Sequence, residues 1–239
     1  MAKIKWLDEY EIKARYIPTF LSVIPIVHFA IMFLGRTFWN ELADNISWML
    51  AVANISFSFV VMLALVQIQS GLGKTWIEES VFGKGGENFP TTNMLLYSGG
   101  LISRQRKEQL QRMISHFSGS TFSTEKEERD DPLNARLQAR EAVGHVRLKV
   151  GHGVMTIKYN IRYGFFRNLI AGVAWGAVGS LGCSILYFAD SAWKPMSFFL
   201  VCFVAFAVLY LMKKQILGKL AFNYADVLFT ELSSQTKGE

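Results

Sequence analysis

The chain has 239 residues, of which 51% are hydrophobic and 18% are charged, and its formal net charge is +6. Soluble domains usually carry about 25% charged residues, so this composition argues against an ordinary soluble domain. The positive charge lies beside apolar segments, where it indicates membrane topology and not nucleic-acid binding.

Four apolar segments define the predicted architecture, and none of them contains Asp, Glu, Lys or Arg. Each approaches the roughly 20 residues needed to cross a hydrocarbon core. We predict an all-α integral membrane protein with two transmembrane hairpins, that is four spans, and a helical cytoplasmic module between spans 2 and 3. The segments are 17–35, 46–68, 169–189 and 195–212. The chain then divides into 1–68 (N-terminal segment and hairpin 1), 69–168 (cytoplasmic module), 169–212 (hairpin 2) and 213–239 (C-terminal cytoplasmic helix).

Two alternatives explain the apolar segments less well. A signal peptide is disfavoured because a lead with three acidic residues precedes the first segment, and no small-residue cleavage site follows it. Buried helices of a soluble core normally carry a polar stripe, and the segment 195–212 has none.

Lysine and arginine flank the spans unevenly. Cations precede the first span and follow the fourth, whereas each short loop within a hairpin carries a single one, Arg36 or Lys194. Because cytoplasmic loops are enriched in Lys and Arg, both termini and the central module are predicted to be cytoplasmic.

The first span contains His28, an ionisable residue near the middle of an apolar segment. Such a residue is a functional candidate by default. His28 could line a polar path, as in a transporter or channel subunit, or simply hydrogen-bond to Asn54, which lies at a compatible depth in the second span. Both interpretations stay open.

The module begins with Gly73-Lys74-Thr75, which resembles the end of a P-loop. The motif requires a glycine at position 68, where this chain has Ile68, and the segment leaves a membrane span, so no nucleotide site is expected. An amphipathic helix is predicted around residues 104–117 and a second helix over 133–150. The first carries basic residues that could contact anionic lipid or an acidic partner, or simply face solvent: Arg104, Arg106, Lys107 and Arg112.

Aromatic and basic residues precede the third span. They are typical of a membrane interface, where rings lie at headgroup level and arginines extend to phosphates: Arg162, Tyr163, Phe165, Phe166 and Arg167. An RNA-binding patch is the alternative, but about twenty apolar residues follow at once.

Small residues recur at helical spacing in the third span: Gly172, Gly176, Gly179 and Cys183. Such a face lets two helix backbones approach closely. It predicts either an oligomer interface or packing against another span of the same chain. The C-terminal helix also has an apolar face, which is expected to pack on the module or on a neighbouring subunit.

Motifs of hydrolases, zinc enzymes and paired-cysteine sites do not occur in the sequence. We therefore expect no enzymatic activity, no cofactor and no bound metal.

Two patches resemble a bacterial four-span membrane protein family with a cytoplasmic insert and a YGFxRN juxtamembrane motif. One contains Gly73-Lys74, Glu78, Gly85-Gly86 and Pro90-Thr91-Thr92 with Leu95, and the other contains Tyr163-Gly164-Phe165 and Arg167-Asn168-Leu169. The resemblance covers the module and the start of span 3 and supplies no activity.

Membrane proteins of this build look similar to components of bacterial antiphage systems. We expect a non-enzymatic, homo-oligomeric sensor or effector in the bacterial inner membrane, because a single module lies between two hairpins, span 3 has a small-residue face and catalytic motifs are missing. Its expected partners are membrane lipids and a cytoplasmic protein or ligand bound by the module, with no nucleic acid bound directly.

Overall fold

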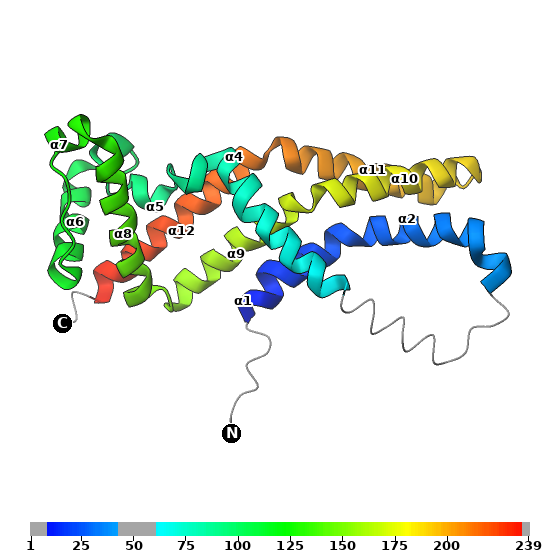
Figure 1. The fold of residues 1–239 in the computed structure, drawn as a ribbon, viewed down its shortest axis with the longest axis horizontal. Coiled ribbons are helices and arrows are strands. Elements are labelled where there is room, and N and C mark those ends of the chain that lie inside the picture. Colours follow the sequence, from blue (N-terminus) through cyan, green and yellow to red (C-terminus); the bar gives the residue numbers. More distant parts are fainter. Residues whose placement is uncertain (1–8, 43–60, 236–239) are drawn as a thin grey trace, which may run out of the picture. The chain divides into compact units, whose positions relative to one another are not determined.

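The chain folds into helices joined by short turns (Figure 1). The computed structural model describes residues 9–42 and 61–235, and within these ranges every regular element is helical. The helices form two compact units. The first, called the membrane unit below, is Met1–Ile77 with Gly164–Lys213, and the second, called the insert unit, is Glu78–Tyr163 with Lys214–Glu239.

These boundaries differ from the predicted divisions at residues 69, 169 and 213. The C-terminal helix α12 (Lys213–Gln235) belongs to the insert unit beyond its first residue, because its apolar face is buried there. Buried residues on this face are Leu217, Ala221, Tyr224, Leu228 and Leu232. Of the two partners predicted for this face, the structure selects the module of the same chain.

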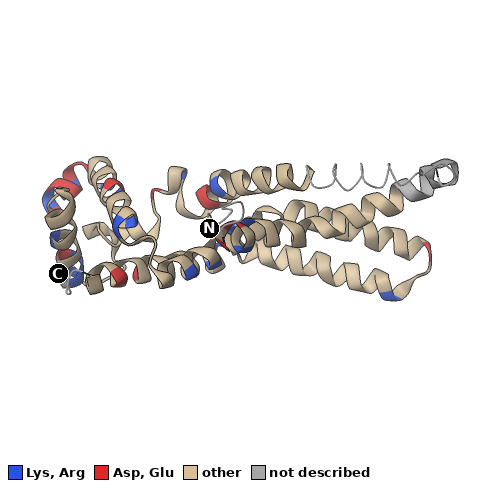
Figure 2. Cartoon of the chain, turned by 90° about the horizontal axis from the view of Figure 1, so that it is seen from below, with Lys and Arg blue, Asp and Glu red and all other residues tan. Residues whose placement is uncertain are grey.

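Two described helices are long and apolar enough to cross a membrane, namely Glu9–Phe33 and α11 (Trp193–Leu211). A third candidate span is the pair α9 (Val154–Ala171) and α10 (Val173–Ala189), which is bent by 49°. The charged residues gather outside these apolar stretches (Figure 2). The described residues are therefore all helical, as predicted, and include two or three candidate membrane spans, whereas most of the predicted span 46–68 lies outside the described residues.

The predicted third span, 169–189, is a helix broken at Gly172. The amide of Gly172 is within hydrogen-bonding distance of the carbonyls of Asn168 (3.0 Å) and Leu169 (3.1 Å), so the hydrogen-bond ladder shifts there. Helix α9 does not begin at the predicted boundary but enters as a continuous helix from Val154. At this bend the side chains of Ser22 and Gln69, both distant in sequence, approach Gly172 closely.

Helix α10 packs closely on α2 (Ile17–Leu42) through its small residues. A Cβ on Gly179 would lie 2.2 Å from the backbone nitrogen of Ile26, and the Cys183 thiol lies 3.5 Å from the Pro25 carbonyl oxygen. A Cβ on Gly176 would lie 2.5 Å from the Phe206 ring of α11. The small-residue face therefore serves helix packing within the chain.

The insert unit contains the helices predicted around 104–117 and 133–150, now bounded as α6 (Arg104–Ser118) and α8 (Pro132–Val150). Between them lies α7 (Glu125–Asp130), which begins with a Thr124–Glu127 capping box. Two shorter helices, α4 (Glu78–Phe82) and α5 (Pro90–Asn93), precede them. Glycines with positive φ shape the turn after α4: Gly83, Gly85 and Gly86.

The close approach of α10 and α2 gives a test of this packing. Gly179→Ala places a methyl group against the α2 backbone, which cannot move aside as a flexible side chain would. We expect a loss of stability of about 1–3 kcal/mol, as is usual for overpacking. Thermal unfolding of the detergent-solubilised chain measures it. Gly71→Ala is the control, because a Cβ at Gly71 meets nothing within 4 Å; an unchanged midpoint for Gly179→Ala would contradict the packing.

Candidate functional site

Three irregularities in the helices of the membrane unit converge on one group of side chains. Residues Ile12–Tyr16 and Gly73–Ile77 form π-helical turns, and α9 ends at the break before α10. Turns of this kind occur frequently at functional sites because they disturb the regular hydrogen-bond ladder. The side chains that join the three irregularities are those of Ser22, Gln69 and Asn168, which we call the polar cluster.

Asn168 is the centre of the polar cluster. Its side-chain Nδ2 donates a hydrogen bond to the Ala14 carbonyl oxygen, inside the first π-helical turn. Its own carbonyl oxygen accepts a hydrogen bond of 2.7 Å from Gln69 Nε2. The side chain of Asn168 thus connects α9 to the N-terminal helix, while its backbone is held by the helix at 61–72.

Ser22 completes the connection from α2. Its hydroxyl oxygen lies 3.2 Å from Gln69 Oε1 and 2.9 Å from the Thr19 carbonyl oxygen, so its single proton can be donated to either. Ser22, Gln69 and Asn168 are fully buried. Buried hydrogen bonds of this kind are strengthened by the low local dielectric, and here they connect the three helices.

Two glycines make room for the polar cluster. A Cβ on Gly172 would lie 2.2 Å from the Ser22 hydroxyl and 2.5 Å from Gln69 Nε2. A Cβ on Gly73 would lie 2.9 Å from Asn168 Oδ1. Among the described residues, that oxygen has no hydrogen-bond partner. The polar cluster therefore retains one buried acceptor beside the second π-helical turn.

The predicted membrane-interface residues divide into two groups. Arg162 is exposed, with its guanidinium 5.5 Å from the Tyr159 ring centre, and Phe165 and Phe166 are half-buried against each other. For Tyr163 and Arg167 the prediction is wrong, because they are only 4% and 6% exposed.

Each of the two buried residues has neighbours inside its own unit. Tyr163 meets the Phe89 ring edge-on within the insert unit, at 5.5 Å between ring centres. In the membrane unit, the Arg167 Nε and Cγ atoms lie 3.5 Å from the position that a Cβ on Gly73 would take. Tertiary packing therefore removes both side chains from the surface where headgroups would meet them.

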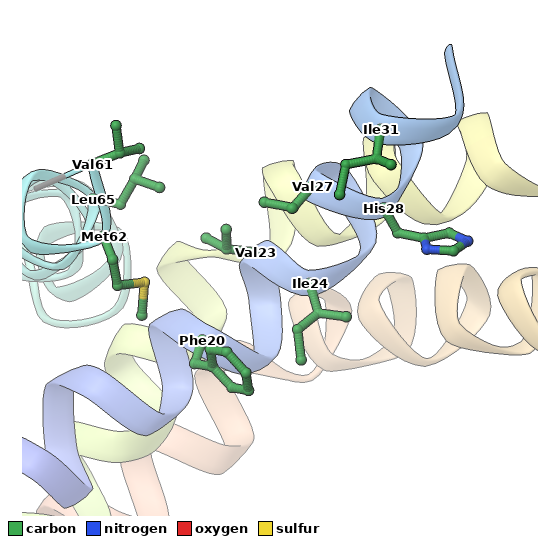
Figure 3. A pocket seen from close by; sticks show the side chains of 9 residues that line it. All are labelled: Phe20, Val23, Ile24, Val27, His28, Ile31, Val61, Met62 and Leu65. Atoms are coloured by element: carbon green, nitrogen blue, oxygen red, sulfur yellow. The ribbon is translucent and has the colours of Figure 1, made fainter. Parts of the chain in front are cut away.

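His28 is engaged by its neighbours. Its Nε2 lies 2.9 Å from the Tyr187 hydroxyl, and its ring stacks on Phe199 at 5.1 Å between centres. The suggested partner Asn54 lies outside the described residues. His28 also borders an apolar groove of about 490 Å³ between α2 and the helix at 61–72, but its ring points away from Val61 and Leu65 (Figure 3). These contacts favour the interpretation of His28 as a neighbour-bonded residue.

The predicted basic residues of α6 have interaction partners within the insert unit. Arg104 pairs with Glu108 and Glu125, and Arg106 pairs with Asp226 at 2.8 Å. The Arg112 guanidinium lies 3.8 Å from a Glu108 oxygen. Lys107 is buried, with its ammonium 5.0 Å from the Tyr97 ring centre. The Arg104 and Arg112 side chains nevertheless remain 68% and 79% exposed, so contact of this face with lipid, an acidic partner or solvent stays open.

Two carboxylates that the sequence analysis missed fix backbone amides of the insert unit. Glu231 of α12 accepts hydrogen bonds from the amides of Met155 (3.0 Å) and Thr156 (3.3 Å), at the start of α9. A carboxylate at a helix N-terminus satisfies free N–H groups and the helix dipole. A Cβ on Gly153 would overlap the Glu231 carboxylate, so a larger residue there would displace this side chain from the amides.

Glu128 is the second of these carboxylates. It is 5% exposed and accepts hydrogen bonds from the amides of Tyr97 (2.7 Å) and Ser98 (2.8 Å). Burial alone would raise the pKa of Glu128, but the hydrogen bonds from Ser98 and Tyr97, with the nearby Lys107 charge, outweigh it and lower the pKa. Burial lowers the pKa of Lys107 in turn.

Among the described residues, no group of three His, Cys, Asp or Glu side chains could hold a metal ion. The absence of a metal and of a cofactor stays a prediction.

Comparison of the chain with protein-family models, curated proteins and solved structures gave no match. The polar cluster is therefore assessed on its geometry alone.

The Glu128 carboxylate gives a pH-dependent prediction. Because its pKa is lowered in the folded state, its charge stabilises the insert unit above the ordinary value near 4.5, and this contribution is lost as the pH falls through the lowered pKa. Glu128→Gln should cost about 1.5–3 kcal/mol at neutral pH, the value of hydrogen bonds to a charged group. The difference from wild type should shrink in acid.

Thermal unfolding of the solubilised chain over a pH series measures this difference. Asp130→Asn is the matched control, because Asp130 is exposed on the same helix. A stability gap between wild type and Glu128→Gln that stays constant into acid would show that the charge of Glu128 contributes nothing.

Proposed function

We propose that the chain is a non-enzymatic membrane sensor or effector, whose insert unit binds a partner protein or small ligand and whose membrane unit responds at the polar cluster. The biological setting proposed is bacterial antiphage defence. The proposed topology has four spans in the inner membrane, lipids as their surroundings, and both termini and the insert unit in the cytoplasm. It rests on the positive-inside distribution of Lys and Arg.

The observation that carries the proposal is the course of α9. Residues 154–163 of this helix belong to the insert unit and residues 164–171 to the membrane unit. Its first turn is held by Glu231, and its last turn is held by the hydrogen bonds of Asn168. A partner that binds the insert unit could displace the first turn of α9. Because α9 is one continuous helix, that displacement would be transmitted to Asn168 in the polar cluster.

The polar cluster is suited to two arrangements. Asn168 Oδ1 is a buried acceptor without a hydrogen-bond partner among the described residues, although such atoms are costly to leave unsatisfied. A small rotation of α9 would exchange the hydrogen bonds of the Asn168 amide. The adjoining π-helical turns can absorb such a change because their ladders are already irregular. These features support a membrane unit that changes state.

Coupling along α9 is tested by hydrogen exchange of the full chain in lipid nanodiscs. Glu231→Ala releases the first turn of α9, and we expect faster amide exchange around residues 168–176 as well as around 154–158. The reason is that local openings spread through a helix whose capping contacts are lost. Mass spectrometry of peptides covering both regions gives the measurement.

Asp226→Ala is the matched control for Glu231→Ala. It removes another α12 carboxylate, which is half-exposed and pairs with Arg106 of α6. Exchange near residues 168–176 should then equal that of wild type. If Glu231→Ala affects only the insert unit, the proposed coupling is refuted.

The biological setting is tested separately by phage challenge of bacteria that express the chain with its neighbouring genes. We expect fewer plaques than with an empty vector, and loss of this protection in Asn168→Leu at equal amounts of membrane-inserted protein. Leucine cannot donate to the Ala14 carbonyl, whereas the control Asp226→Ala leaves the polar cluster intact. Plaque counts equal to those of the empty vector for every phage tested would refute the role in defence without bearing on the coupling.

A further inference from the structure

Helix α8 is apolar on two opposite faces. It packs against α5, α6 and α7 with one face (Figure 1). This face is buried and consists of small and β-branched residues: Ala135, Ala139, Ala142, Val143, Val146 and Val150. On the opposite face, Leu133, Leu137 and Leu148 are 68%, 55% and 79% exposed. The core of the insert unit therefore does not account for the three leucines.

Gly144 lies in the middle of this exposed face. At 3.6 residues per turn, Gly144 and the three leucines fall within an arc of about 60° on the helix. A glycine inside a helix lowers its stability relative to alanine. No atom lies within 4 Å of the position that a Cβ on Gly144 would take, so packing inside the described chain does not require a glycine there. A glycine beside leucines is the usual means of letting a second helix approach closely.

We propose that this face of α8 is the surface through which two copies of the chain associate, with the two α8 helices parallel and related by a twofold axis. The face, called the α8 stripe below, consists of Leu133, Leu137, Gly144 and Leu148. Its four members share one face of α8, so a second helix laid along this face would cover all of them. This inference goes beyond the proposed function and does not depend on it.

The charges beside the α8 stripe decide both the occupant and the orientation. Arg140 lies on one edge of the stripe and Glu141 on the other, and both residues are exposed. In a parallel twofold pair, each edge faces the opposite edge of the second helix, so Arg140 meets the partner's Glu141 on both sides of the seam. An antiparallel pair would instead bring Arg140 beside the partner's Arg140. In the parallel arrangement the charges on the two edges therefore attract each other. An interface between two identical surfaces requires such self-complementarity.

The small-residue face of α10 is not available for the same purpose. It is occupied by α2 and by Phe206 within the chain. The α8 stripe therefore replaces it as the candidate interface between copies.

Charge exchange tests the pair in the full chain, purified in detergent and measured by light scattering over a dilution series. We expect a dimer for the wild type. Arg140→Glu and Glu141→Arg should each weaken the dimer, so that it dissociates at a higher protein concentration. Each exchange replaces the Arg140–Glu141 ion pair on both sides of the seam with two like charges. The double exchange restores both ion pairs and should restore the dimer. Arg112→Glu is the control, since it makes the same charge change on an exposed residue of α6.

Cysteine cross-linking tests the orientation independently. Leu133→Cys places thiols at equivalent ends of two parallel helices, so a short bismaleimide should link two chains, while Arg112→Cys should not. A monomeric wild type, or single exchanges as stable as wild type, would overturn the proposal and leave the α8 stripe to a different protein. A dimer in which Leu133→Cys fails to cross-link would overturn the parallel arrangement.

Discussion

The need to satisfy backbone hydrogen-bonding groups away from water governs the membrane unit. A backbone carbonyl that is buried away from water costs free energy unless it accepts a hydrogen bond. Here the irregular turns are brought together, and the side chains of Asn168 and Gln69 bind the Ala14 and Asn168 carbonyls. The break before α10 is tolerated because the side chains that compensate for it lie on neighbouring helices.

The same constraint explains where glycine occurs. Gly73 and Gly172 leave space for the amide and hydroxyl groups of the polar cluster, while Gly179 lets α10 touch the α2 backbone. Lipid offers no hydrophobic gain for bringing helices together, so contact area and hydrogen bonds must provide the stability. Close packing at the glycines and the hydrogen bonds of the polar cluster therefore both hold the helices of the membrane unit together.

The insert unit stabilises itself by different means. Several of its cations, Arg104 and Arg106 among them, pair with carboxylates, and two further carboxylates, Glu128 and Glu231, bind backbone amides at the turn 97–98 and at the start of α9. Hydrogen bonds to a charged acceptor are stronger than neutral ones, and burial makes their loss more costly. Its surface is consequently less basic than the sequence indicates, and its exposed apolar residues on α8 stand out.

The sequence by itself determined the membrane class and the helices with strong local signals. Ser103 caps α6 and Gly119 ends it in a left-handed conformation, while Pro132 marks the start of α8. Only the tertiary structure decided the break at Gly172, the burial of Arg167, the use of the small-residue face within the chain, and the roles of Glu128 and Glu231. Capping and hydropathy act between residues close in sequence, whereas Asn168 meets Ala14 and Gln69 across 154 and 99 positions. Such partners become neighbours only when the helices have packed.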